Sequence, residues 1–125
     1  MNKKVSTEKA PKPVGPYSQA VKAGQFLFVS GQLAIDPKQG KIVEGNIEQQ
    51  TILIMENIKA ILQTARYTID DIVISNVYLS SMALFNEFNS TYGGYFKQEF
   101  PARVTVGVEL PPRALVEISV TAYKE

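Results

Sequence analysis

The sequence predicts an α+β sandwich in which helices cover one face of a small mixed sheet, and three observations lead to this prediction. The chain has 125 residues, the size of a single compact domain over residues 1–125. Apolar residues recur every three or four positions in two segments and every second position in others. These segments follow one another as strands, helix, strand, helix and two strands, an order that places the helices on one side of the sheet.

The first forty residues indicate an extended lead-in followed by one strand. Pro11, Pro13 and Pro16 fix φ and disfavour helix, so the chain around them is expected to run extended. Residues 26–29 are aromatic and branched, which favours a strand. Residues 36–40 carry proline early and glycine late, and therefore indicate a turn after that strand.

The clearest helix is expected from residue 46 to about residue 66. Asn46 is suited to cap its N-terminus, and Gln49 stands three residues later, as in a capping box. The residues expected to face the core recur at intervals of three or four. They are Ile47, Thr51, Ile54, Ile58, Ile61 and Ala65.

A further strand and a second helix are expected in the next segment. Residues 72–79 are rich in branched side chains and predict the strand. Ser81 is placed to cap the helix, and Pro101 is expected to end it. Gly93 and Gly94 weaken this helix by about 1 kcal/mol each relative to alanine. Its apolar stripe consists of Phe85, Phe88, Tyr92 and Phe96.

The last quarter predicts two strands, at residues 103–109 and 115–122, in which apolar and polar residues alternate. An antiparallel pairing across a loop at 110–114 would put the valine, isoleucine and alanine side chains on one face, under the helices. The opposite, polar face would then carry both Arg103 and Glu117. So small a sheet leaves its far face and edges exposed, and oligomerisation is the natural way to bury them.

The composition excludes several kinds of active site. The chain has no Cys and no His, so disulfides, thiol nucleophiles, His bases and Ser-His-Asp triads are impossible, and structural zinc is not favoured. Catalysis would have to use carboxylates, Tyr, Lys, Arg, hydroxyls, backbone groups or water. We expect neither a metal nor a cofactor, because no set of oxygen ligands, glycine-rich phosphate loop or dinucleotide motif is found in the sequence.

Charge and hydropathy indicate where the protein acts and with what. No apolar run approaches the roughly 20 residues that span a bilayer, and no apolar stretch follows the N-terminal lysines, so we expect a cytoplasmic protein without a membrane partner. A net charge of +1 does not favour nucleic acid. Residues 1–41 carry seven lysines against two acidic residues; a solvated arm is the favoured interpretation and an RNA-binding arm the alternative.

Arg103 and Glu117 are the candidate catalytic residues. The Arg103 guanidinium suits bidentate binding of a substrate carboxylate, and the alternative is a structural ion pair with Glu109, Glu117 or another neighbour. Glu117 stands between apolar neighbours, where desolvation would raise its pKa and let it deprotonate a water; the alternative is a solvent-facing strand residue. Residues 15–18 and 30–32 are glycine-containing turns, for which ordinary turn chemistry is the simpler explanation.

Short motifs follow one another in a specific order over nearly the whole chain. They are Gly15-Pro16-Tyr17-Ser18-Gln19-Ala20, Phe28-Val29-Ser30-Gly31-Gln32, Ile35-Asp36-Pro37, Glu56-Asn57-Ile58-Lys59-Ala60-Ile61-Leu62, Asn89 before Tyr92, Phe100-Pro101-Ala102-Arg103, and Leu110-Pro111 leading to Val116-Glu117-Ile118. Each motif is modest evidence alone, but their order and spacing are specific. The chain resembles the RidA (YjgF-type) reactive intermediate deaminases.

The resemblance implies a chorismate-mutase-like (YjgF-like) subunit with a mixed six-stranded sheet and two helices on one face. It also implies a barrel-like homotrimer with active sites between subunits. The implied activity is cofactor-independent and metal-independent hydrolysis of 2-iminopropanoate and 2-iminobutanoate to 2-keto acids and ammonia. These imines and their enamine tautomers arise from pyridoxal-phosphate-dependent dehydratases acting on Ser and Thr. The alternative is a non-catalytic module that binds a small carboxylate or a protein partner.

The resemblance also assigns roles position by position. Arg103 would bind the substrate carboxylate, Glu117 would activate the attacking water, and Tyr17 would line the same pocket as a third catalytic residue. The residues that would contact the substrate are Ser30, Gly31, Asn89 and Thr105. Thr105 replaces a cysteine that is frequent in the family, which excludes a thiol role. Arg66 stands where the first helix often ends in glycine, so a left-handed cap there would be strained.

Overall fold

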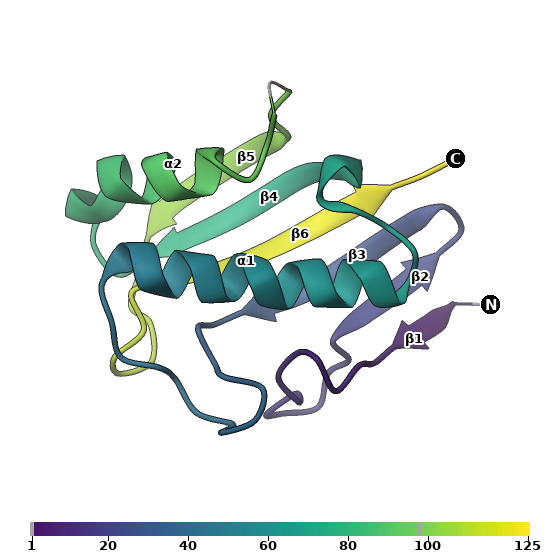
Figure 1. Cartoon of the computed structure of the whole chain (residues 1–125), viewed down its shortest axis with the longest axis horizontal. Coiled ribbons are helices and arrows are strands. Elements are labelled where there is room, and N and C mark those ends of the chain that lie inside the picture. The colour runs from purple at the N-terminus through teal and green to yellow at the C-terminus, as the bar shows by residue number, and fades with distance from the viewer. Residues whose placement is uncertain (1, 98) are drawn as a thin grey trace.

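The computed structural model describes residues 2–97 and 99–125 (Figure 1). Within this part the chain forms a six-stranded sheet with the spatial order β1-β2-β3-β6-β4-β5, two α-helices and two short 3-10 helices. All neighbouring strands are antiparallel except β4 and β5. The strands are β1 (Lys3–Val5), β2 (Ala20–Ala23), β3 (Phe26–Gln32), β4 (Ile72–Leu79), β5 (Ala102–Gly107) and β6 (Val116–Tyr123). The α-helices are α1 (Ile47–Thr64) and α2 (Phe85–Gly93).

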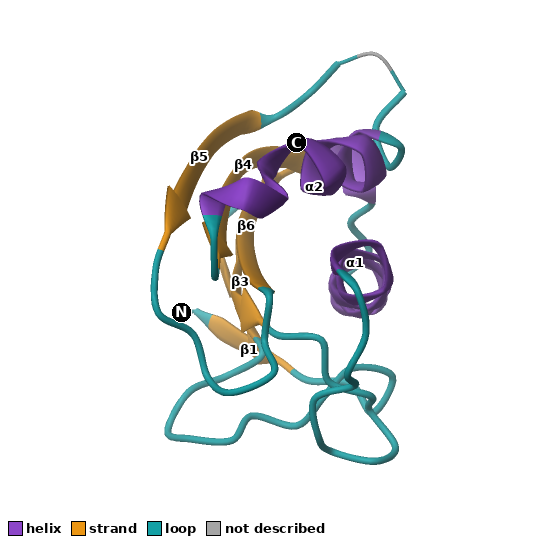
Figure 2. Cartoon of the chain, turned by 90° about the vertical axis from the view of Figure 1, so that its left-hand side faces the viewer, coloured by secondary structure: helices purple, strands orange, loops and turns teal. Residues whose placement is uncertain are grey.

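Both helices lie on the concave face of the sheet, which curves around them in Figure 2. The core fills the space between the two layers, because every second strand residue and one stripe of each helix point inward. The buried apolar residues of β6 and α1 include Val116, Ile118, Val120, Ala122, Ile54, Met55, Ile58, Ile61 and Leu62. The predicted α+β class, with two helices on one face of a mixed six-stranded sheet, is confirmed.

Helix α1 begins as its sequence predicts. Asn46 Oδ1 accepts a hydrogen bond from the Gln49 N–H at 2.8 Å, and Gln49 Oε1 accepts one from the Asn46 N–H at 3.0 Å. Both halves of the capping box are therefore formed. Of the residues expected to face the core, Ile47, Thr51, Ile54, Ile58 and Ile61 are buried and Ala65 is half-buried.

The C-terminus of α1 has the strained left-handed cap that was considered from the sequence. Arg66 follows the helix with φ of 68°, in the left-handed region. The Tyr67 N–H then donates to the Leu62 carbonyl at 2.8 Å, and the Lys124 ammonium donates to the Arg66 carbonyl at 2.7 Å. These bonds close the last turn and hold a non-glycine residue at a position that favours glycine.

Arg66→Gly is expected to stabilise the protein by about 0.5–1 kcal/mol, because glycine adopts a positive φ without steric cost. For a chain of this size that corresponds to a rise of roughly 2–5 °C in Tm. A thermal melt measures the shift. Gln63→Gly, one turn earlier at an exposed position inside α1, is the matched control and should lower Tm by a similar amount. Equal losses in the two variants would contradict the strain at Arg66.

Helix α2 begins as expected but ends early. Ser81 Oγ accepts from the Ala83 N–H at 3.1 Å and starts the 3-10 helix Met82–Leu84, which runs directly into α2. The helix ends at Gly93, so the expectation that it continues to Pro101 is wrong. The two consecutive glycines have low helix propensity and end it first.

The predicted pairing of the two C-terminal strands is also wrong. β4 lies between β5 and β6, and it pairs in parallel with β5, with Ser75 opposite Arg103. β6 pairs with the other edge of β4 in antiparallel fashion, with Tyr78 opposite Glu117. The physical reason is that β4, α2 and β5 form a βαβ crossover, while residues 108–115 are long enough to pass around β4 to β6.

The crossover reverses the faces expected for β5. Val104 and Val106 point away from the helices and are 52% and 38% exposed, whereas Arg103 and Thr105 face α2. Glu117 lies on the convex face, between buried Val116 and Ile118. The placement of Arg103 and Glu117 on one polar face is therefore wrong, because a period of two separates two sets of residues without saying which set is inside.

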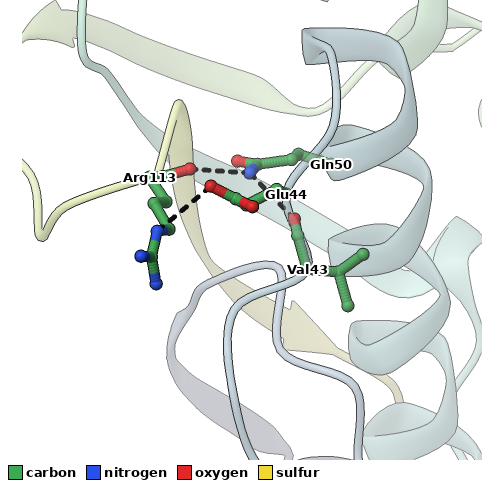
Figure 3. A network of polar contacts seen from close by, with 4 residues as sticks. All are labelled: Val43, Glu44, Gln50 and Arg113. Carbon is green, nitrogen blue, oxygen red and sulfur yellow. Dashed lines mark hydrogen bonds and ion pairs between the residues drawn. The ribbon is translucent and has the colours of Figure 1, made fainter.

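A buried glutamine fixes the path of the chain between β5 and β6. Gln50 Nε2 donates to the Val43 carbonyl at 3.1 Å and to the Arg113 carbonyl at 2.8 Å (Figure 3). Gln50 Oε1 accepts from the Leu115 N–H at 2.9 Å. Arg113, with φ of 74°, also pairs with Glu44 at 3.1 Å, but both side chains are exposed and such a pair contributes little. Gln50 therefore sets how the chain enters β6.

Candidate functional site

All candidate residues except Thr105 line one of two separate pockets. The Arg103 pocket, of about 320 Å³, lies beside α2 and the start of β5. It is lined by Asn89, Tyr92, Gly93, Phe100, Pro101 and Arg103. The Glu117 pocket, of about 300 Å³, lies on β3 and β6. It is lined by Tyr17, Ser30, Gly31, Leu33 and Glu117. Either volume suits a small ligand.

The guanidinium of Arg103 is held against aromatic rings. Its Cζ lies 5.7 Å from the ring centroid of Phe85, 5.6 Å from that of Phe88 and 5.2 Å from that of Tyr92. Among residues 2–97 and 99–125, no carboxylate lies within ion-pair distance of Arg103. The structural ion pair with Glu109 or Glu117 that the sequence left open is therefore not formed between these residues.

The ring nearest to Arg103 is itself fixed in position. Tyr92 is 3% exposed, and its hydroxyl donates to Ser75 Oγ at 2.8 Å in the core. Burial raises the pKa of Tyr92, although the Ser75 hydrogen bond and the positive charge of Arg103 oppose the shift. The phenol therefore stays neutral around pH 7.

Two acceptor oxygens beside this arginine lack partners. Asn89 Oδ1 and Thr105 Oγ1 are fully covered, and neither makes a hydrogen bond within the described chain. A buried polar atom without a partner costs about 1–3 kcal/mol. Asn89 lines the Arg103 pocket, and a ligand there would reach this covered oxygen only after the Asn89 side chain turns toward the pocket.

The Glu117 pocket is built on a β-bulge. Val29 pairs with Val120 and Gln32 pairs with Ile118, so Ser30 and Gly31 together oppose a single residue of β6. The bulge brings the backbone of β3 against the Glu117 carboxylate. A Cβ on Gly31 would overlap Glu117 Oε2, so the close approach requires glycine.

Partial burial changes the acidity of Glu117. Desolvation raises its pKa above the ordinary value. A carboxylate with a raised pKa is a stronger base than an exposed glutamate. Glu117 is therefore suited to accept a proton from a water molecule in the pocket.

Tyr17 and Ser30 complete this pocket through backbone contacts. The Val14 N–H donates to the Tyr17 hydroxyl oxygen at 3.2 Å, which leaves the phenolic proton free to donate elsewhere. The Ser30 hydroxyl donates to the Ser18 carbonyl at 2.6 Å. Buried Gln19 anchors the N-terminal segment by donating to the carbonyls of residues 7, 10 and 11 and by accepting from the N–H of residue 7.

The predicted residues form two groups, one in each pocket, and the two groups lie apart within one chain. Arg103 and Asn89 share one pocket, and Tyr17, Ser30, Gly31 and Glu117 share the other. Arg103 and Glu117 are two strands apart and three residues out of register, which puts their Cα atoms about 14 Å apart on opposite faces of the sheet.

Two features of the site were missed by the sequence prediction. Phe85, Phe88 and Tyr92 were predicted as core, whereas they also contact the Arg103 guanidinium. Their i, i+3 and i+7 spacing on one helix face was the available signal. The structural role of Gln19 had no sequence signal, because its partners are backbone carbonyls.

Other kinds of site find little support in the described part of the chain. Residues 2–97 and 99–125 contain no cluster of three or more acidic, His or Cys side chains that could hold a metal ion. The same residues include no helix with the length and apolar character needed to cross a bilayer. The lysines of the N-terminal arm, Lys3, Lys4, Lys9 and Lys12, are all exposed.

Comparisons with known proteins agree with the geometry. Residues 7–124 match the family model described as Endoribonuclease L-PSP. A RutC family protein of Pyrococcus horikoshii is 52% identical and aligns over 100% of both chains. The crystal structure of RidA from an Antarctic Psychrobacter is 38% identical, with a TM-score of 0.93 over 98% of this chain and 99% of that one. Escherichia coli TdcF with bound serine is 32% identical, with a TM-score of 0.92 over the same shares.

These matches extend over nearly the full length of the sequence and span all the residues that line the two pockets. The chain belongs to the RidA (YjgF-type) family, whose model carries the description Endoribonuclease L-PSP.

Proposed function

We propose that this protein is a homotrimeric deaminase that hydrolyses 2-iminopropanoate and 2-iminobutanoate to 2-keto acids and ammonia. The observation that carries the proposal is the Arg103 guanidinium, which lines a small pocket without a carboxylate partner among the described residues. A free guanidinium in a partly dry pocket binds a small carboxylate bidentately. A 2-imino acid places its reacting carbon directly beside such a carboxylate.

Substrate binding would use both ends of the imino acid. Arg103 would hold the carboxylate, and the unpartnered Asn89 Oδ1 would accept the iminium N–H once its side chain turns toward the pocket. Thr105, with its own unpartnered oxygen, lies next to Arg103 on the same face of β5. The serine bound to the Escherichia coli relative supports this reading, since serine also carries its nitrogen on the carbon next to a carboxylate.

Glu117 would carry the chemical step. The carboxylate accepts a proton from water as the water oxygen forms a bond to C2 of the protonated imine, giving a tetrahedral amino alcohol. The proton then passes to the amine nitrogen, the C–N bond breaks, ammonia leaves and the C2 hydroxyl loses its proton to give the keto acid. The phenolic proton of Tyr17, free to donate into the pocket, would bind the C2 oxygen as it forms.

The separation of Arg103 and Glu117 is the argument for sites shared between subunits, and the family resemblance is the argument that the subunits form a trimer. Arg103 and Glu117 of one chain are too far apart to hold one small imino acid, so a complete site needs Arg103 from one subunit and Glu117 from a neighbour. The convex face carries exposed apolar side chains that a neighbouring copy would cover. They include Phe26, Phe28, Val73, Val104 and Val106, which are 38–52% exposed.

The proposal is tested by coupling the purified protein to a threonine dehydratase and following 2-ketobutanoate and ammonia. We expect release faster than the spontaneous hydrolysis of the imine. A rate equal to the spontaneous rate would refute deaminase activity. Retained binding of a small carboxylate without turnover would instead favour the non-catalytic module.

The endoribonuclease description is tested in parallel with labelled RNA. RNA binding that weakens steeply with salt would favour the lysine-rich arm as its site.

Gly31→Ala is expected to lower kcat/KM at least tenfold with little change in Tm. The new methyl group displaces the Glu117 carboxylate, which lies at the end of a flexible side chain and can move without disturbing the core. Initial rates and thermal melts measure the two effects. The control is Gly94→Ala, where the new methyl group finds only ordinary contacts and activity should be retained. Wild-type activity in Gly31→Ala would argue against Glu117 as the base.

A further inference from the structure

We propose that Phe85, Phe88 and Tyr92 are positioning residues that hold the Arg103 guanidinium in place while leaving its charge free for a substrate carboxylate. These three residues are called the aromatic cage below. The inference rests on the proposed function, because it deepens the role of Arg103 in that same site.

The geometry of the cage comes from a single helix face. Its members stand at positions i, i+3 and i+7 of α2, so all three rings point toward the start of β5. Their centroids lie between 5.2 Å and 5.7 Å from the Arg103 Cζ. Each distance is within the range of a cation–π contact.

The cage solves a problem that a carboxylate partner would create. An acidic side chain beside Arg103 would hold it in place but would also occupy the N–H donors that a substrate carboxylate needs. Aromatic faces attract the cation through the ring quadrupole and use none of those donors. The guanidinium therefore stays ordered and still lines the Arg103 pocket with its charge unneutralised by the described residues.

The cage is rigid on its inner side and open on its outer side. Phe88 is fully buried, and Tyr92 is held by the hydrogen bond to Ser75 and stacks on Phe88 with centroids 5.2 Å apart. Phe85 is only half-buried. Phe85 is therefore the cage member that can be replaced with the least damage to the core.

The test is a double-mutant cycle on pyruvate binding, measured by calorimetry at low salt. Phe85→Leu should weaken binding about threefold to tenfold, and Phe85→Tyr, which keeps a ring, should restore it. In an Arg103→Lys background the Phe85→Leu change should have a clearly smaller effect, because the hydrated ammonium makes a weaker contact with the ring than the guanidinium does. Equal losses in both backgrounds, or unchanged binding in Phe85→Leu, overturn the inference. So does a wild-type protein that binds no pyruvate.

A second readout needs no ligand. The chain has only three arginines, so the Arg103 Nε–H resonance can be assigned by its absence in Arg103→Lys. Ring currents from the cage should shift this resonance away from those of Arg66 and Arg113, and Phe85→Leu should reduce the shift. Phe96→Leu is the matched control: the Phe96 ring packs tilted against Tyr92, with centroids 5.0 Å apart, but it is not one of the rings around the guanidinium. A shift unchanged in Phe85→Leu, or reduced equally in Phe96→Leu, overturns the inference.

The two readouts separate this inference from the proposed function. If the wild-type protein does not accelerate imine hydrolysis, the deaminase proposal fails. The cage is still supported when pyruvate binding and the resonance shift depend jointly on Phe85 and Arg103. If hydrolysis is accelerated but neither depends on Phe85, the cage fails and the deaminase proposal stands.

Discussion

Arg103→Lys is expected to lower kcat/KM for imine hydrolysis about 100-fold, although it keeps the positive charge. A lysine ammonium is a compact point charge and cannot make the parallel pair of hydrogen bonds that a guanidinium makes with a carboxylate. Its ammonium is also more strongly hydrated and lacks the flat guanidinium face, so it packs less well against the rings of Phe85, Phe88 and Tyr92. Both effects weaken binding of the substrate and of the transition state.

Steady-state kinetics with imine generated in situ measure this loss. Arg103→Ala should remove activity to the level of spontaneous hydrolysis. Arg66→Lys is the matched control, because Arg66 is exposed at the end of α1 and its side chain lies outside both pockets. We expect wild-type kinetics for it. An Arg103→Lys enzyme within threefold of wild type would refute bidentate binding by Arg103.

Local rules were enough to predict α1 and β4 from the sequence. Asn46 and Gln49 form the expected capping box, and β4 runs over Ile72–Leu79, the same residues that the branched run indicated. Both features depend only on residues that are close together in the sequence. Propensity and periodicity therefore carry the relevant information.

Pairing between distant strands could not be predicted in the same way. The alternation in β5 was recognised, but Val104 and Val106 lie outside and Arg103 lies inside, against the expectation. An inward arginine contradicts the ordinary pattern of burial, and it is tolerated here because aromatic rings of α2 contact it. The sequence also predicted that α2 continues to Pro101, whereas it ends at Gly93. The predicted helix length therefore gave no indication of the crossover from β4 to β5 either.

The site shows the same division between local and distant information. The motifs predict Arg103, Glu117, Tyr17 and Gly31 as site residues. The need for glycine at position 31 is explained only by the Glu117 carboxylate that approaches it across the bulge. The assignment of both charged residues to one face failed because face depends on register. Under the proposed function, each chain would therefore carry two half-sites.

Glu117→Gln is expected to lower kcat at least 100-fold, because the amide cannot accept a proton from water. Burial raises the pKa of Glu117, so the wild-type rate should fall on acidification at a higher pH than an ordinary carboxylate would give.

The raised pKa of Glu117 also makes stability depend on pH, but in the opposite direction: acidification lowers the rate and stabilises the fold. A carboxylate that is harder to ionise when folded destabilises the protein as pH rises through its folded pKa. Glu117→Gln should therefore raise Tm at neutral pH and lose this advantage in acid.

Two inactive variants should restore activity when they assemble together. A chain with Arg103→Ala keeps its Glu117, and a chain with Glu117→Gln keeps its Arg103. If each site takes Arg103 from one subunit and Glu117 from the next around a ring, every mixed trimer contains one intact site, or about one third of wild-type activity. Co-expression with two different affinity tags, followed by purification on both, isolates these trimers. Activity no higher than in either variant alone would mean that Arg103 and Glu117 do not act together across a subunit boundary.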